Sequence, residues 1–246
     1  MSFAVREAAL AEVMDGPCDE RRLFATYRHF ALANRVVSGW RRIYTARLRP
    51  LLRERAAAGG GADAAPLRLL DVGFGGGDIP RALAAWAAAD RLPLAVTAID
   101  PDERALAYVT SAARSDPGHA GPAAGAVRYL VADTAALRAA GERFDVVVSN
   151  HVLHHLDAAA LASALDDSAA LATCLVLHDD LERSRLAHAA WAVGALPFAV
   201  DSYAWVDGLR SIRRSYTVAE LAAAVPQGWR VERAVPWRLL LVRAAP

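Results

Sequence analysis

The stretch Asp71-Val72-Gly73-Phe74-Gly75-Gly76-Gly77 decides the fold of this chain, because it ends an apolar run and precedes an alanine-rich segment. The run before it, residues 67–70, is short and follows a proline, as is typical of a buried parallel strand. Alternate glycines let the backbone turn sharply and approach a ligand where a Cβ atom would clash. Asp78, as an N-cap-like residue, and Pro80 then begin a helix. We expect a nucleotide-like ligand over the N-terminus of this helix, near free backbone N–H groups.

Asp78 distinguishes between two kinds of nucleotide cofactor. A dinucleotide-binding fingerprint that begins at Gly73 has its third glycine at position 78, where this chain has an aspartate. The loop therefore disfavours a dinucleotide-dependent oxidoreductase, which remains an alternative that nicotinamide-cofactor binding would test.

Composition narrows the class of protein. The 246 residues are enough for one large α/β domain, and 55% of them are hydrophobic, which argues against disorder. All 28 basic residues are arginines, scattered along a chain of net charge +1, so we expect no nucleic-acid partner. Two cysteines far apart in sequence form neither a metal knuckle nor a disulfide framework. The apolar stretch at about 187–200 is too short for a bilayer, and the N-terminus lacks a signal-peptide core. The sequence predicts a soluble, cytoplasmic protein without a membrane partner and leaves its oligomeric state open.

Strand-like and helix-like segments alternate after residue 67, as in a doubly wound, Rossmann-like α/β sheet. The chain then departs from this pattern: Thr217 and Glu220 form a capping box, and two β-rich segments follow with only Pro236 and Trp237 between them. So short a connection requires an antiparallel hairpin. The predicted strands are 67–72, 94–99, 127–131, 144–149, 173–177, 229–235 and 238–244, and the predicted helices are 78–89, 102–115, 134–140, 158–171 and 217–224.

Two regions lie outside this core. Residues 1–57 are predicted to form a helical N-terminal cap, since the apolar residues of 19–49 fall largely at helical spacing. Residues 181–215 are an insert after the fifth strand, within a domain of residues 67–246. The insert leaves the carboxyl edge of the sheet, where open α/β folds bind ligands. We expect both regions to form an apolar lid over substrate, with Tyr27, Trp40 and Tyr203 among its contacts.

From about residue 67 to 244 the chain resembles class I methyltransferases that use S-adenosylmethionine (SAM). The glycine loop matches the segment under the methionine part of SAM, and Asp100 matches the acidic residue that binds both ribose hydroxyls. Asp133 matches the acceptor for the adenine amino group, although it could equally be a helix N-cap. The cofactor contacts that the resemblance implies are Asp71, Gly73, Gly75, Gly77, Asp100, Pro101, Asp133 and Asn150.

The segment after the fourth predicted strand indicates which class of molecule accepts the methyl group. Methyltransferases that act on base amino groups usually carry Asn/Asp-Pro-Pro-aromatic here, whereas this chain has Asn150-His151-Val152-Leu153-His154. A small-molecule acceptor is therefore favoured. A hydroxyl acceptor benefits from a general base of near-neutral pKa, and we expect His154 or His155 to supply it. If the segment is helical, these two and His151 share a face. We predict no metal site, with the three histidines plus Asp179 or Asp180 as the alternative.

The outer segments carry a narrower resemblance, to methyltransferases found beside type III polyketide synthases. It rests on residues 27–30, 34–35, 38–42, 178–184 and 211–216. The resemblance implies O-methylation of a phenolic, alkylresorcinol-type acceptor, with His151 and Asp179 beside the substrate. Asp179, Asp180 and Arg183 could instead order the lid through ion pairs. Two alternative functions remain: methyl transfer to carbon, and SAM binding without methyl-transfer activity.

Overall fold

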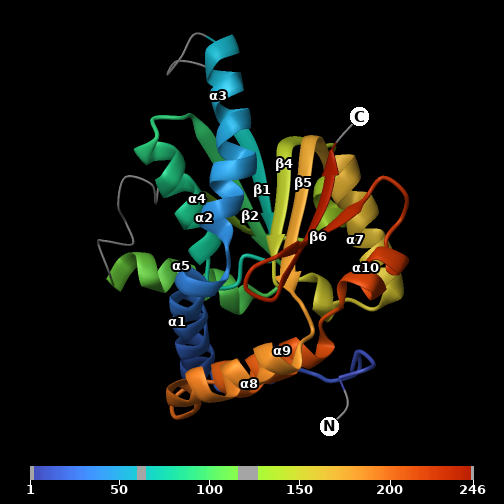
Figure 1. Ribbon diagram of the computed structural model, residues 1–246. Coiled ribbons are helices and arrows are strands. Elements are labelled where there is room, and N and C mark those ends of the chain that lie inside the picture. Colours follow the sequence, from blue (N-terminus) through green and yellow to red (C-terminus); the bar gives the residue numbers. More distant parts are fainter. Residues whose placement is uncertain (1–2, 60–64, 116–126, 245–246) are drawn as a thin grey trace. The chain divides into compact units, whose positions relative to one another are not determined.

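The computed structural model describes residues 3–59, 65–115 and 127–244. Seven strands form one sheet, and the predicted α/β fold with a terminal antiparallel hairpin is confirmed (Figure 1). The strands are β1 (Leu67–Val72), β2 (Leu94–Asp100), β3 (Val127–Val131), β4 (Phe144–Asn150), β5 (Ala172–Leu181), β6 (Arg230–Ala234) and β7 (Arg238–Ala244). Their order in the sheet is β3-β2-β1-β4-β5-β7-β6.

Helices connect the parallel strands. Those of the alternating part are α4 (Asp78–Ala89), α5 (Glu103–Ser115), α6 (Thr134–Ala139) and α7 (Ala158–Leu171). Both β2 and β4 pair with β1 in parallel, with Leu69 opposite Val96 on one side and Val146 on the other. The strand order therefore reverses at β1, and the chain leaves β1, β2 and β4 at the same edge. In open α/β sheets such a switch point is where ligands bind.

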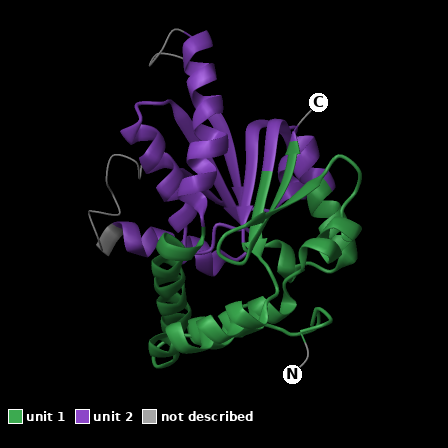
Figure 2. Ribbon diagram, in the orientation of Figure 1, with its two compact units in different colours: residues 1–38, 151–165, 177–243 green, residues 39–150, 166–176, 244–246 purple. Residues whose placement is uncertain are grey.

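The chain divides into two compact units, coloured separately in Figure 2. Unit 1 comprises residues 1–38, 151–165 and 177–243, and unit 2 comprises residues 39–150, 166–176 and 244–246. Residues 181–215 fall entirely within unit 1. The lid over substrate and the domain bounds at 57 and 67 remain predictions.

Unit 2 contains the glycine loop and the strands on either side of it. Its core is built by side chains of β1, β2 and β4, among which Leu70, Ala98 and Val146–Val148 have no exposed surface. Strands buried on both faces read as continuous apolar runs, which is why their positions were predictable. Cys174 lies in β5 and is exposed.

In unit 1, β6 and β7 form the predicted hairpin, with Arg230 opposite Val242 and Ala234 opposite Arg238. The capping box between Thr217 and Glu220 begins α10 (Val218–Ala224), as expected. The insert folds into α8 (Arg185–Gly194), a 3-10 turn (Leu196–Ala199) and α9 (Ala204–Arg214). A Cβ atom on Gly208 would stand 2.3 Å from the Trp191 indole, so this glycine lets α8 and α9 approach.

The predicted N-terminal helical region is helical, but it is not one helix. Helix α1 (Glu20–Val37) ends before Gly39, whose φ of 71° is the left-handed conformation that terminates helices. The chain restarts as α2 (Trp40–Ile43), continues as a π-helix (Tyr44–Leu48) and ends in α3 (Arg49–Ala58). The break at Gly39 is also where unit 1 passes into unit 2.

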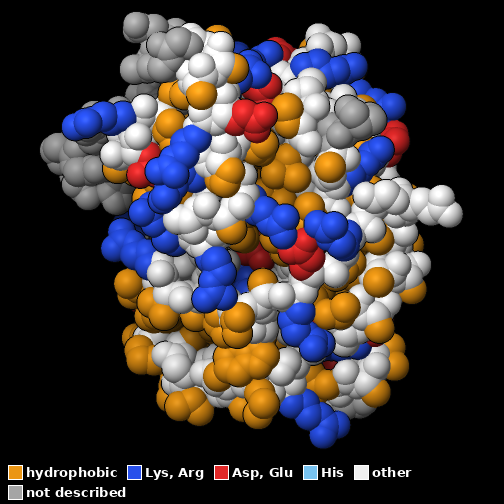
Figure 3. Space-filling view, turned by 45° about the horizontal axis from the view of Figure 1, so that its top comes forward, with side chains coloured by type: hydrophobic (Ala, Val, Ile, Leu, Met, Phe, Trp, Pro, Cys, Tyr) orange, Lys and Arg blue, Asp and Glu red, His pale blue; other side chains and the backbone are white. Residues whose placement is uncertain are grey.

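No helix among residues 3–59, 65–115 and 127–244 is long and apolar enough to cross a membrane. Arginine side chains are spread over the face shown in Figure 3, with acidic side chains between them. Hydrophobic side chains gather at the lower end of that view.

Candidate active site

The glycine loop adopts backbone conformations that glycine alone reaches without strain. The φ angles of Gly73, Gly75 and Gly77 are 75°, 47° and 67°. Gly77, and not Asp78 as predicted, is the N-cap of α4; Asp78 is the first residue inside the helix. Since Gly77 is left-handed, it turns the chain from the loop into the helix axis.

Several loop N–H groups donate within unit 2. Those of Gly73 and Phe74 donate to the carbonyl of Ile99 at 2.8 and 3.3 Å. The N–H of Gly75 donates to Oδ2 of Asp100 at 2.9 Å. The loop after β1 is thus fixed to the end of β2 by three hydrogen bonds. These three loop N–H groups are therefore used inside the protein, and they precede the N-terminus of α4, where free N–H groups were predicted.

Asp100 has a carboxylate held in place by backbone donors. Its other oxygen, Oδ1, accepts from the N–H of Asp102 at 2.9 Å. Burial raises the pKa of Asp100, while the bonds from Asp102 and Gly75 oppose this. A carboxylate offers about four acceptor positions, so both oxygens retain capacity for the hydroxyls of a diol. Pro101 lies before α5 rather than in its first turn, and Asp102 caps that helix through the N–H of Arg104 at 2.8 Å.

Asp71 is the buried carboxyl group of this edge. It is 2% exposed, and no hydrogen bond to its Oδ1 is made by the described part of the chain. Burial, and then the charges of Asp78 and Asp100, hold its pKa well above the usual value. A buried acceptor without a donor costs about 1–3 kcal/mol. Such an atom near the end of β1, directly before the glycine loop, fits a ligand position.

Asp133 and Asn150 also have roles inside unit 2. Asp133 is the N-cap of α6, where it accepts from the N–H of Ala136 at 2.8 Å. Asn150 ends β4, and its Oδ1 accepts from the indole of Trp40 at 3.0 Å. Trp40, expected to contact substrate, is 1% exposed and instead orients Asn150. We call residues 71–77, 100–101, 133 and 150 the cofactor edge.

His151 follows Asn150 directly but belongs to unit 1. Its φ of 61° is unusual for a residue with a side chain, and its N–H donates to the carbonyl of Asp179 at 2.9 Å. Nε2 of His151 contacts the guanidinium of Arg238, which forms a buried ion pair with Asp179. Burial, and then the charge of Arg238, hold the pKa of His151 well below its usual value. His151 is therefore neutral at neutral pH.

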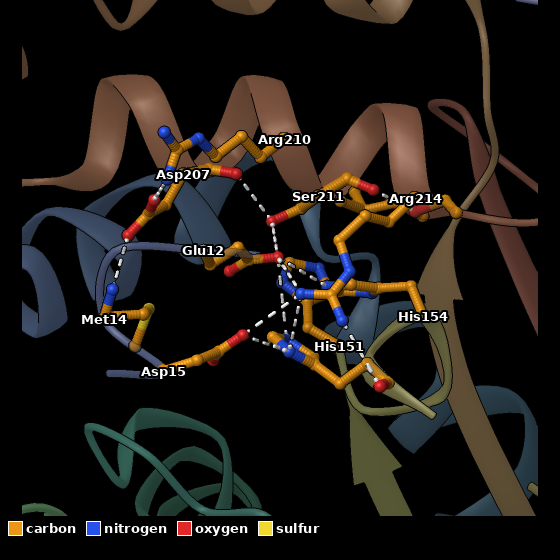
Figure 4. A network of polar contacts seen from close by, with 12 residues as sticks. Glu12, Met14, Asp15, His151, His154, Asp207, Arg210, Ser211 and Arg214 are labelled. Carbon is orange, nitrogen blue, oxygen red and sulfur yellow. Dashed lines mark hydrogen bonds and ion pairs between the residues drawn. The ribbon is translucent and has the colours of Figure 1, made fainter. Parts of the chain in front are cut away.

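His154 has the opposite electrostatic environment (Figure 4). Its ring is 1% exposed, with Nδ1 2.6 Å from Asp180 and Nε2 3.4 Å from Glu12. Burial works to lower the pKa of His154, but Asp180 and then Glu12 outweigh it and raise that pKa to about 9. His154 thus carries a proton at neutral pH, which removes the lone pair that a general base needs.

His155 is the more exposed neighbour. Its Nδ1 lies 3.2 Å from Asp15, and Nη1 of Arg214 lies 3.1 Å from the same carboxylate oxygen. Only residues Leu153–His155 form a 3-10 turn, so the expected helical face shared with His151 does not exist. The rings are nonetheless neighbours, because the centroids of His154 and His155 are 4.3 Å apart. We call Glu12, Asp15, His154, His155, Asp180 and Arg214 the Glu12 cluster.

Sequence reasoning missed Glu12, Asp15, Arg214 and Arg238. Glu12 and Asp15 come from a segment without regular secondary structure, and nothing in their spacing marks them. Of the predicted lid contacts, Tyr27 is 5% exposed, and the hydroxyl of Tyr203 accepts from the N–H of Asp19 at 3.2 Å. The predicted site residues thus fall into two sets, the cofactor edge with Trp40 in unit 2 and the remainder in unit 1.

Comparisons with known proteins agree with this geometry. Residues 70–171 match the family profile of a methyltransferase domain. This stretch runs from β1 to the end of α7 and contains the whole cofactor edge. No curated protein matches the chain. A methyltransferase domain implies SAM as the cofactor.

Solved structures match over most of the chain. The plantazolicin methyltransferase BpumL in complex with S-adenosylhomocysteine (SAH) aligns at a TM-score of 0.52 and 11% identity, covering 92% of this chain and 95% of that one. The CMeT domain of the citrinin polyketide synthase aligns at 0.50 and 12%, covering 73% of this chain and 46% of that one. The magnesium protoporphyrin IX methyltransferase of Synechocystis PCC 6803 aligns at 0.49 and 16%, covering 93% and 100%. At these identities the first two establish the fold alone.

Proposed function

We propose that this protein transfers the methyl group of SAM to a small molecule, and that the acceptor is a phenolic or polyketide-type hydroxyl. The observation that supports SAM as the methyl donor is the hydrogen bond from Gly75 to Asp100. This bond holds the glycine loop against the carboxylate that would bind the ribose diol, at the switch point of the sheet. The buried Oδ1 atom of Asp71 receives no hydrogen bond from the described residues, and this also fits a bound ligand at the loop. The match of residues 70–171 to a methyltransferase domain supports the same function.

The residues of the cofactor edge would hold SAM as follows. The glycine loop would lie under its methionine part, Asp100 would accept from the ribose hydroxyls, and Asp133 would accept from the adenine amino group. Bound SAM supplies a methyl on a sulfonium cation, so the protein's task is to position the acceptor in line and exclude water. Asn150, oriented by Trp40, ends β4 at the edge where that methyl would lie.

For the acceptor proton we assign His151 in place of the predicted His154 and His155. His151 follows Asn150 directly in the chain, so their Cα atoms are about 3.8 Å apart. The lone pair of the neutral ring lies at Nε2, beside the Arg238 guanidinium, so the acceptor hydroxyl would displace that guanidinium to pass its proton to His151. The guanidinium of Arg238 beside it favours a phenolate over a phenol.

The acceptor class has weaker, indirect support. The chain lacks the Pro-Pro-aromatic continuation after Asn150 that base-modifying methyltransferases carry. One of the similar structures belongs to a polyketide synthase. Transfer to oxygen and transfer to carbon differ in the product, so mass spectrometry of a phenol panel incubated with isotope-labelled SAM distinguishes them.

Substitution of Asp100 tests the donor assignment. Asp100→Ala removes two charge-assisted acceptors, and we expect the affinity for SAM, measured by calorimetry, to fall by about 100-fold or more. Asp102→Ala is the matched control: it removes a helix cap in the same loop and should leave SAM affinity unchanged. Equal SAM affinity in wild type and Asp100→Ala would refute the assignment.

Substitution of His151 tests the proton acceptor. His151→Asn keeps a residue that tolerates positive φ, and we expect kcat on a phenol to fall by about 100-fold with the KM for SAM unchanged. His29→Asn, far from the cofactor edge in sequence, serves as the control. Normal turnover of His151→Asn would mean that positioning alone drives the reaction.

A further inference from the structure

The Glu12 cluster brings two imidazoles and a carboxylate toward one point within unit 1. The Nε2 atoms of His154 and His155 lie 3.4 and 3.8 Å from the same oxygen, Oε1 of Glu12. One donor atom from each of the three residues lies within 4.8 Å of the others. Two ligands held about 2.0–2.1 Å from a tetrahedral zinc ion stand about 3.4 Å apart. Small side-chain rotations therefore suffice to place all three atoms around one ion.

The opposite nitrogen of each imidazole is held by a carboxylate. Nδ1 of His154 lies 2.6 Å from Asp180, and Nδ1 of His155 lies 3.2 Å from Asp15. A carboxylate on Nδ1 fixes the tautomer in which Nε2 has a free lone pair, and metal-binding histidines are oriented in this way. Two adjacent histidines with the same arrangement, both facing one glutamate, match a metal site with its outer ligands in place.

Nε2 of His154 gives a second, independent indication. It is a buried nitrogen that finds no hydrogen-bond partner within the described ranges of the chain, although Glu12 lies opposite it (Figure 4). A buried polar atom that lacks a hydrogen bond costs about 1–3 kcal/mol of stability. A bound cation that displaces the proton of His154 would accept the lone pair of Nε2 and remove this cost.

The charges of the cluster favour a divalent cation. The cluster contains three carboxylates, those of Glu12, Asp15 and Asp180, and one guanidinium, that of Arg214, which contacts Glu12 and Asp15. With both imidazoles neutral, the cluster carries a surplus of two negative charges. A proton on His154 offsets part of this surplus, so protons and a metal ion compete for the cluster.

We propose that Glu12, His154 and His155 bind one zinc ion, with water completing a tetrahedron. Nitrogen and carboxylate ligands in this number are typical of zinc. The ion would tie the N-terminal segment that carries Glu12 to the turn after β4. None of its three residues belongs to the cofactor edge, and the proposal does not depend on methyl transfer.

The test is a zinc titration of the full chain after treatment with a chelator. We expect one zinc ion per chain by calorimetry and by elemental analysis, and a weaker affinity at pH 6 than at pH 8. His155→Gln should weaken binding more than 100-fold, and Asp15→Asn, which acts through His155, by about 10- to 100-fold. His188→Gln, which alters a histidine outside the cluster, should bind zinc as the wild type does.

Asp15→Asn keeps the test decisive if His155→Gln does not fold, because it leaves all three proposed ligands in place. Circular dichroism of each variant without metal establishes that it is folded. Equal zinc affinity in wild type, Asp15→Asn and folded His155→Gln would overturn the proposal. So would a stoichiometry far below one, which would identify the cluster as an ion-pair network only.

Discussion

The cofactor edge and the Glu12 cluster are built in opposite ways. The cofactor edge takes its residues from the ends of four adjacent parallel strands, and its glycines and aspartates fall at positions that strand-loop-helix geometry dictates. The Glu12 cluster joins residues near positions 12, 154, 180 and 214, and only the folded chain brings them together. Local rules thus suffice for the first region, whereas ion pairs between distant segments make the second.

The comparison predicts that removing a single charge lowers the stability of the protein most when the charge lies in unit 1. Arg238→Met leaves the buried carboxylate of Asp179 without its guanidinium, and we expect a loss of about 3–5 kcal/mol in urea unfolding. Adding Asp179→Asn to this variant should restore at least half of the loss. If the double variant is as unstable as the single one, the arginine acts through packing rather than through charge.

The same logic predicts a pH dependence. Because folding raises the pKa of His154 to about 9, its contribution to stability is complete below pH 6.5 and disappears as pH rises through 9. We expect a loss of about 3 kcal/mol across this window in metal-free protein. His154→Gln should abolish this slope while leaving other titrations intact. Identical slopes in the two proteins would show that His154 does not carry the proton.

In unit 2 the expected effects come from backbone geometry. Gly77→Ala combines a positive φ with a Cβ only 2.8–2.9 Å from Arg81, Tyr129 and Val109, and we expect a loss of about 2–3 kcal/mol. Gly141→Ala has a similar φ of 72° in open space, so it should cost about 1 kcal/mol. Chemical denaturation measures both. Equal losses would mean that crowding around the loop is unimportant.

The smallest expected effect distinguishes the two roles considered for Asp133, the N-cap of α6 and the acceptor for the adenine amino group. Asp133→Ser preserves an N-cap for α6, so stability should stay within about 0.5 kcal/mol, whereas Asp133→Ala should lose about 1 kcal/mol. Both variants lack the acceptor for adenine, and we expect SAM affinity to fall by a few-fold in each. An unchanged SAM affinity would mean that Asp133 acts only as the N-cap of α6.

The strands of unit 2 could be predicted almost to the residue, since buried parallel strands are apolar runs bounded by glycine, proline and aspartate. The fifth strand was the exception. It continues to Leu181 through His178, Asp179 and Asp180. A polar run predicts a loop, but here Arg238 and His154 pair with the two carboxylates and make burial possible.

The site was predictable to the same extent. The positions of the glycine loop and Asp100 followed from motif spacing, whereas Trp40 was placed on a lid because an aromatic residue gives no sign of which face it buries. We predicted His154 or His155 as the general base and His151 beside the substrate, without foreseeing that the pKa values of His151 and His154 are shifted in opposite directions. Burial lowers the pKa of both rings, Arg238 lowers that of His151 further, and Asp180 and Glu12 reverse the effect for His154; these three residues are distant in sequence.

Calorimetric titration of the full chain with SAM and with NAD in parallel tests the central claim most directly. We predict that SAM binds to one site per chain and that NAD does not bind, because Asp78 stands where a dinucleotide loop requires glycine. Binding of NAD, or binding of neither cofactor to folded protein, would contradict the assignment of the cofactor edge.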